Sequence, residues 1–169
     1  MIEIVRTHLE MPHRDALRPA RSPGDGILIE RWHPISAHEY RLLYDEVGGP
    51  WHWRDRLRWS DEELDAMLSS PEVHVWTLRV GDETAGFFEL QRHTADHVEI
   101  MYFGLVRRFI GRGLGGWMLT CAVEKAFGLG ASRVTLHTCS LDAPQALPNY
   151  LARGFSIVRE ERYDAEVSA

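Results

Sequence analysis

The chain has 169 residues, of which 44% are apolar and 26% are charged, and its formal net charge is −6. This predicts one domain over residues 1–169 with its own apolar core, and residues 1–25 of this domain are expected to form an irregular arm. The acidic charge argues against a general nucleic-acid-binding protein, which needs a basic surface. No apolar run approaches the roughly 18 residues of a membrane span. Without a recognisable leader, Cys121 and Cys139 are expected to be reduced thiols in a cytoplasmic protein.

The first half of the chain is expected to contain one strand and two helices. Residues 27–32 have the apolar character of a strand. Residues 37–47 repeat apolar side chains at helical spacing, and a Gly-Gly-Pro sequence follows them. Ser60 and Glu63 match a capping box, which predicts a short helix over residues 64–68.

The second half is dominated by strands. Strands are predicted at residues 73–80, 84–92, 97–106, 133–138 and 155–159. One helix should follow the glycines near residue 113, and another should begin near residue 147. Only the unit over residues 97–138 indicates a parallel crossover. The expected fold is therefore α+β, a mixed and mostly antiparallel twisted sheet of about six to seven strands, flanked by about four helices in α/β/α layers.

The most informative segment is a glycine-rich turn between a predicted strand and a predicted helix. Glycines at 111, 113, 115 and 116 leave the first backbone N–H groups of that helix open to a bulky anion. The helix dipole adds a partial positive charge there. Three arginines add full charges nearby: Arg107, Arg108 and Arg112. This arrangement indicates a phosphate-binding turn.

Two common phosphate-binding motifs fit this turn poorly. A dinucleotide-binding fingerprint would follow an early strand of a repeated βαβ series, whereas this turn follows three predicted antiparallel strands. A Walker A loop needs Gly-Lys-Ser or Gly-Lys-Thr, which the turn lacks. A nucleotide-binding protein that uses the same turn nevertheless remains an alternative.

The order of elements and the turn instead resemble the GCN5-related N-acetyltransferase (GNAT) superfamily, which binds acetyl-CoA. In that family a turn of pattern Arg/Gln-x-x-Gly-x-Gly/Ala holds the pyrophosphate. The pattern can begin at Arg108, which keeps the arginine, or at Ile110, which better matches the family's distances to the strand and to Leu119. We prefer Ile110, a departure that is tolerable because backbone amides make most anion contacts.

A second motif strengthens the resemblance, which covers roughly residues 27–163. Tyr150, followed by Gly154 and Phe155, is similar to the family's closing signature of a tyrosine followed after three residues by Gly-Phe. The resemblance implies an acetyl-CoA-dependent N-acetyltransferase in which an amine attacks the thioester directly. The cofactor contacts it implies are Phe103, Leu105, Val106, Ile110, Gly111, Arg112, Gly113, Leu114, Gly115 and Gly116.

The resemblance also implies roles in the chemistry. Tyr150 matches the family's general acid for the leaving thiolate. A backbone N–H on the strand near Phe103 to Leu105 would stabilise the oxyanion, and Gly104 is expected to mark a bulge that frees such a group. Glu99 matches the catalytic glutamate of the histone-acetyltransferase-like branch. Glu89, His137 or a chain of waters remain alternatives for the base.

The acceptor is less defined by the sequence. Trp51 and Trp53 lie where family members commonly build the acceptor pocket, and Glu89 and His137 are further candidates for it. The nine histidines are scattered, so no metal site is expected. The expected partners are acetyl-CoA and an amine, without nucleic acid or membrane, and a homodimer is left open. The alternative function is a non-catalytic CoA-binding or regulatory module.

Overall fold

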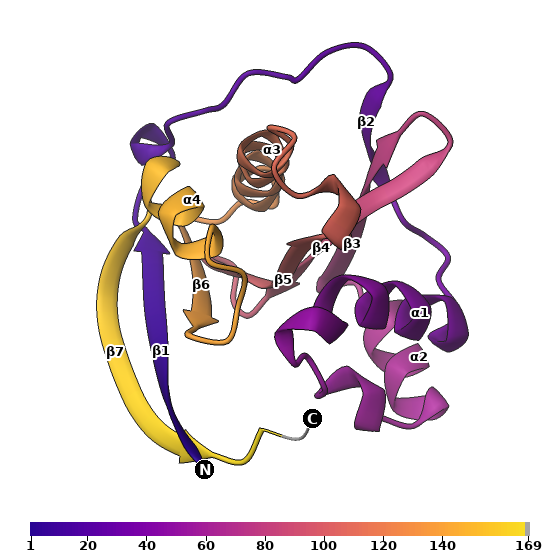
Figure 1. Cartoon of the computed structure of the whole chain (residues 1–169). Helices are drawn as coiled ribbons and strands as arrows, with labels where there is room; N and C mark the ends of the chain where they lie inside the picture. The colour runs from indigo at the N-terminus through magenta and orange to yellow at the C-terminus, as the bar shows by residue number, and fades with distance from the viewer. Residues whose placement is uncertain (168–169) are drawn as a thin grey trace.

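The computed structural model describes residues 1–167, which contain one seven-stranded sheet and four α-helices (Figure 1). The sheet order is β2-β3-β4-β5-β6-β1-β7, antiparallel except where β5 meets β6. The strands are β1 (Ile2–Met11), β2 (Ile27–Arg31), β3 (Val73–Val80), β4 (Glu83–Arg92), β5 (His97–Leu105), β6 (Arg133–Cys139) and β7 (Ser156–Ala165). The helices are α1 (Ala37–Gly48), α2 (Asp61–Ser69), α3 (Gly115–Gly128) and α4 (Ala146–Ala152). The predicted α+β fold is confirmed.

Local sequence signals explain where the helices begin. Both α1 and α2 start with a capping box, formed by Ser36 with Glu39 and by Ser60 with Glu63. Helix α4 tolerates Pro148 because the residue lies in its first turn, where backbone N–H groups have no partner inside the helix. None of the helices over residues 1–167 is long and apolar enough to cross a bilayer.

Residues 2–11 differ from the prediction. Instead of an irregular arm, Ile2–Met11 form β1, which lies between β6 and β7 and pairs antiparallel with both. The chain then crosses irregularly to β2, apart from one 3-10 turn at Arg14–Ala16. Strand β1 escaped prediction because its partners lie more than 120 residues away and its pairing with β7 shifts register after His8.

The two faces of the sheet carry different helices (Figure 1). On β5, a side chain at Gly104 would point to Val47 of α1, whereas the Leu105 side chain lies near Gly115 of α3. Adjacent strand residues point to opposite faces, so α1 and α3 cover opposite faces. We call these the α1 face and the α3 face. Helix α2 contacts α1 and β3, while α3 packs on β4, β5 and β6 and contacts α4.

Candidate active site

Strands β5 and β6 separate partway along their length, and a cavity opens there. They are paired only from His97 with Arg133 to Glu99 with Thr135, among the residues described. Beyond that point lies a cavity of about 490 Å³. Its wall includes the second half of β5, residues of β6, β1 and β7, the loop after α1, and Gly115 and Tyr150 from α3 and α4. The cavity therefore connects the beginning of α3 with both faces of the sheet.

A β-bulge shapes this opening, and it lies at Met101. Glu89 pairs with Tyr102 but Leu90 pairs with Ile100, so Met101 is the extra residue on β5. The expectation of a bulge at Gly104 was wrong. Gly104 is instead required by close packing, because a Cβ there would lie 2.6 Å from Val47 Cγ1.

The bulge determines which β5 side chains share a face. Side chains alternate along a strand, so Glu99 and Tyr102 would normally point to opposite faces. The extra residue between them brings both to the α1 face, while Phe103 lies on the α3 face, where its ring meets Tyr150 edge-on at 6.0 Å. The cavity is therefore lined by polar side chains on the α1 face and by Phe103 and Tyr150 on the α3 face, so that two different reactants could approach from opposite faces.

Two backbone amides of β5 point into the opening. The N–H of Val106 donates to the C=O of Ala85 at 2.8 Å, which places that pair in a hydrogen-bonded position. In an antiparallel ladder these positions alternate, so the N–H and C=O groups of Phe103 and Leu105 point away from β4, toward the gap beside β6. They are available to an extended ligand and to a developing oxyanion.

The glycine turn leads from β5 into α3. Gly111 and Gly113 have φ angles of +82° and +76°, which L side chains rarely adopt. Val106, Phe109 and Leu114 are buried and anchor the turn to the core. Ile110 and Gly115 line the cavity. The N–H groups at the start of the 14-residue α3 therefore face the cavity mouth.

The arginines of the turn are less free than the sequence suggested. Arg108 is paired with Glu83 at 2.9 Å and with Glu46 at 3.5 Å. Arg112 is exposed and lies over the Phe109 ring, 5.2 Å from its centroid. The helix N-terminus therefore supplies attraction for an anion at this end of the cavity, together with Arg107 and Arg112, which are both exposed and form no ion pair within residues 1–167.

Tyr150 is positioned by α4 and by aromatic contacts. Its ring packs between Phe103 and Phe155, and its side chain is buried in the cavity wall. Burial, and after it the negative charge of Asp142, raises the pKa of the Tyr150 hydroxyl above its usual 10. The hydroxyl is therefore protonated near neutral pH and can donate a proton.

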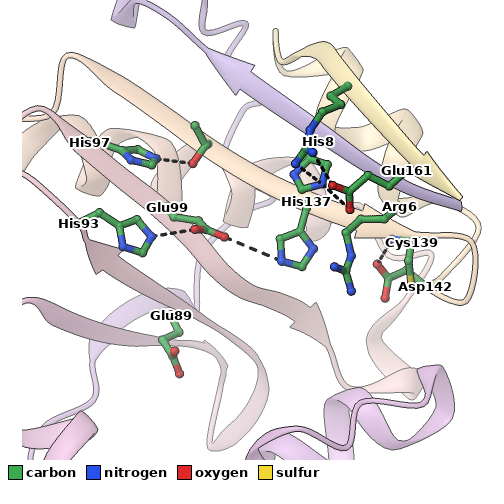
Figure 2. Close-up of polar contacts among 12 residues, drawn as sticks. Arg6, His8, Glu89, His93, His97, Glu99, His137, Cys139, Asp142 and Glu161 are labelled. Carbon is green, nitrogen blue, oxygen red and sulfur yellow. Dashed lines mark hydrogen bonds and ion pairs between the residues drawn. The ribbon is translucent and has the colours of Figure 1, made fainter. Parts of the chain in front are cut away.

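A row of polar side chains crosses the α1 face beside the cavity (Figure 2). Glu99 Oε1 lies 2.7 Å from His93 Nε2, and Glu99 Oε2 lies 3.9 Å from His137 Nε2. The His137 ring lies 5.7 Å from the ring of His8. Burial lowers the pKa of His137 below its usual 6.5 despite the opposing effect of Glu99. His137 is neutral near pH 7, and it lines the cavity, whereas Glu99 lies behind it.

Glu89 lies elsewhere. It is fully buried beneath α1, where it pairs with Arg56 Nη2 at 2.7 Å and accepts a hydrogen bond from the Tyr40 hydroxyl at 2.5 Å. Arg56 in turn lies over the Trp59 ring, 4.1 Å from its centroid. The structure does not bring Glu89 to the cavity wall, and the pair instead ties β4 to the loop after α1. The sequence pattern alone could not show which of Glu89 and Glu99 reaches the cavity, because each is a glutamate within one of two neighbouring strands.

The loop after α1 supplies an aromatic wall. Trp51 and Trp53 both line the cavity, and Trp53 packs against Tyr44 and Tyr102 with ring centroids 5.5 and 5.1 Å away. The Trp53 Nε1–H donates to Asp142 at 3.3 Å across the cavity. Two residues that sequence reasoning missed also line it, Arg6 from β1 and Tyr163 from β7, because neither strand segment was expected there.

Metal and thiol chemistry find no support in the described residues. No group of three or more potential ligands is close enough to hold a metal ion between residues 1 and 167. Cys121 and Cys139 are free, and burial raises the pKa of both thiols, to about 11 for Cys121. Cys139 lines the cavity as a neutral thiol, a poor nucleophile.

Sequence comparisons match this region of the chain. A model of the acetyltransferase (GNAT) family matches residues 37–155. Mycothiol acetyltransferase from Corynebacterium efficiens is 30% identical over 125 residues, which cover 67% of this chain and 42% of that protein. Mycothiol acetyltransferase from Corynebacterium aurimucosum is 37% identical over 79 residues, covering 45% of this chain and 26% of that protein. The chain therefore spans less than half the length of these relatives.

Solved structures show the same fold. A GCN5-related N-acetyltransferase from Sphaerobacter thermophilus superposes with a TM-score of 0.68 at 17% identity, covering 95% of this chain and 51% of that chain. The family match ends at Phe155, so it includes the glycine turn and Tyr150 but neither β1 nor β7. The wall that these two strands contribute to the cavity is outside the matched region.

Proposed function

Because the chain belongs to the acetyltransferase (GNAT) family, we propose that it transfers an acetyl group from acetyl-CoA to an amine. The observation that carries this proposal is the cavity between β5 and β6, which joins the N-terminus of α3 to Tyr150 and His137. Since the curated relatives are more than twice as long as the matched region, the activity is proposed for the domain over residues 1–167.

The donor lies along the α3 side of the cavity. The N–H groups at the start of α3 and around Gly111 and Gly113 bind the pyrophosphate. The pantetheine arm extends beside β5, where the exposed backbone groups of Phe103 and Leu105 act as strand-like partners. The thioester carbonyl then lies in the gap between β5 and β6, with a backbone N–H at the developing oxyanion.

The acceptor approaches from the α1 face. The amine nitrogen attacks the carbonyl carbon, and the carbon–sulfur bond then breaks to give the amide and the CoA thiolate. His137 takes the proton that the amine loses, because it lines the cavity as a neutral imidazole. With Nε2 toward Glu99, the Nδ1 atom is left to accept that proton, and Glu99 stabilises the resulting cation. Glu99 therefore acts through His137.

The leaving thiolate takes its proton from Tyr150. Burial holds this hydroxyl in the protonated form, and its ring is fixed against Phe103, beside the proposed carbonyl position. Because acetyl-CoA lies on the α3 side and the base on the α1 face, the amine can attack the thioester directly. No covalent acyl-enzyme intermediate is needed. We also infer a cytoplasmic location, because Cys121 and Cys139 are free thiols and thiols stay reduced in the cytoplasm.

The proposal is tested with the Tyr150→Phe variant. Calorimetry should show CoA binding to the unmodified protein in preference to ATP and NAD, and a thiol-release assay with an amine panel should show turnover. Tyr150→Phe should keep the affinity for CoA and lower kcat by about 10²–10⁴-fold, the usual contribution of a positioned acid. CoA binding without turnover of any amine would favour a non-catalytic CoA-binding module. Absence of CoA binding at millimolar concentration would remove the cofactor assignment.

A further inference from the structure

Arg6 is a half-buried cation in the cavity wall that has no acidic partner within residues 1–167. Arg6 extends from β1, where its Cα pairs with those of Cys139 on β6 and Glu161 on β7. Its guanidinium lies in the cavity wall on the α1 face, and Figure 2 shows it beside His137. The group is held by Tyr163, whose hydroxyl accepts from Arg6 Nη2 at 3.1 Å and whose ring centroid lies 5.1 Å from Arg6 Cζ.

The acidic groups around Arg6 are engaged with other partners. Asp142 accepts from the Thr138 hydroxyl at 2.5 Å and from the Cys139 N–H at 2.9 Å. Glu161 is paired with Arg159 at 2.5 Å and with His8 at 3.4 Å. Within residues 1–167, no carboxylate lies within 4.0 Å of the Arg6 guanidinium, and its Nε is shielded from solvent without a hydrogen-bond partner.

A half-buried guanidinium without a carboxylate partner raises the free energy of the folded protein unless a ligand supplies that partner. A guanidinium that is partly removed from water loses hydration, and a carboxylate bound through two parallel N–H···O contacts restores it. The Arg6 guanidinium is preorganised to bind a carboxylate, because its contacts with the Tyr163 hydroxyl and ring fix its plane. The other arginines of the cavity wall are differently placed: Arg58 is exposed, and Arg54 donates to the backbone C=O of Trp53.

We propose that Arg6 binds a carboxylate carried by the acceptor amine itself, so that the acceptor class is an amino acid or a similar amino carboxylate. This deepens the proposed function and rests on it. His8 pairs with His137, and Arg6 lies two residues before His8 on β1. The Cα atoms of Arg6 and His137 are therefore separated by about 8 Å, from a rise of about 3.3 Å per residue and a strand spacing of about 4.8 Å. A carboxylate on Arg6 therefore directs the amine of the same molecule toward His137.

The test compares acceptors that differ only in the carboxylate. The pairs are L-phenylalanine with phenethylamine, L-leucine with isoamylamine, and 4-aminobutyrate with propylamine, and kcat/KM is measured by thiol release. The unmodified protein should prefer the carboxylate member of at least one pair by about 10–100-fold, the range expected for hydrogen bonds to a charged group. Arg6→Met should reduce that preference to near one. Arg6→Lys should restore only part of it, because lysine lacks the fork.

A binding measurement covers the case in which no acceptor is turned over. N-acetyl-L-phenylalanine and N-acetylphenethylamine are titrated into the CoA-saturated protein, and the carboxylate compound should bind more tightly to the unmodified protein but not to Arg6→Met. Failure of CoA binding would count against the proposed function, whereas CoA binding with no carboxylate preference would overturn this inference alone. Arg58→Met provides a comparison at the exposed side of the same cavity. If it removes the preference and Arg6→Met does not, the inference is also overturned.

Discussion

The glycine of the closing Tyr-x-x-x-Gly-Phe motif should be intolerant of a methyl group because of its contact with the N-terminal segment. Gly154 has a φ angle of +109°, and a Cβ there would lie 2.0 Å from the backbone oxygen of Ala16. The same segment is tied down where the Arg18 N–H donates to the Arg153 C=O at 2.8 Å. The Gly154→Ala variant must therefore displace backbone rather than a flexible side chain.

A matched substitution isolates this contact. Gly130 has a similar φ of +94°, but a Cβ there would have no neighbour within 4 Å. Both alanine variants lose about 1–2 kcal/mol to the left-handed backbone conformation and regain about 0.4–1 kcal/mol through the unfolded chain. Only Gly154→Ala adds overpacking, which costs about 1–3 kcal/mol. For a chain of this size, that difference corresponds to a Tm lower by roughly 2–12 °C.

The assay is urea and thermal unfolding of the two variants beside the unmodified protein. Gly154→Ala should unfold at a lower urea concentration than Gly130→Ala, with the same dependence of the free energy of unfolding on urea concentration. Equal midpoints for the two variants would refute the reasoning, because the contact between Ala16 and Gly154 would then contribute nothing. A reduced urea dependence in Gly154→Ala alone would indicate that the N-terminal segment had already detached.

Two further predictions concern charged groups. With increasing pH, kcat/KM should rise through a midpoint below 6.5, because burial lowers the pKa of His137 and only its neutral form accepts a proton. The His137→Gln variant should lose this rise, and an identical rise in the variant would exclude His137 as the base. Arg56→Met should lower the free energy of unfolding by about 3–5 kcal/mol near pH 7, because it leaves Glu89 buried without its cation. That deficit should shrink as the pH falls, since a buried carboxyl with a raised pKa binds more protons in the folded than in the unfolded state. Adding Glu89→Gln should recover part of the stability at pH 7, and a double variant no more stable than Arg56→Met would contradict this account.

Local signals predicted much of the fold. The Ser60–Glu63 capping box and the apolar spacing of α1 depend on neighbours within a few residues, and both helices form as expected. The glycine turn was recognisable for the same reason, because Gly111 and Gly113 supply backbone conformations that other residues rarely adopt. Such features carry their physical cause within the segment itself.

The pairing of strands that lie far apart in the sequence was harder to predict. Strand β1 has buried residues at Ile4, Thr7, Leu9 and Met11, so its spacing is not strictly alternating. Its two partners come from the last quarter of the chain, and only they make its burial pattern understandable. A high content of β-branched residues over the first seven positions was the one signal that could have indicated a strand.

The sequence by itself determined the family resemblance, the glycine turn and the closing Tyr150 motif, because each is encoded in a short run of residues with its own steric or chemical requirement. Only the tertiary structure distinguished the surroundings of the three candidate bases. The Met101 bulge brings Glu99 to the α1 face, the divergence of β5 from β6 exposes His137 to the cavity, and α1 buries Glu89 with Arg56. These outcomes depend on strand register and helix packing between distant segments, which also place Arg6 in the cavity wall.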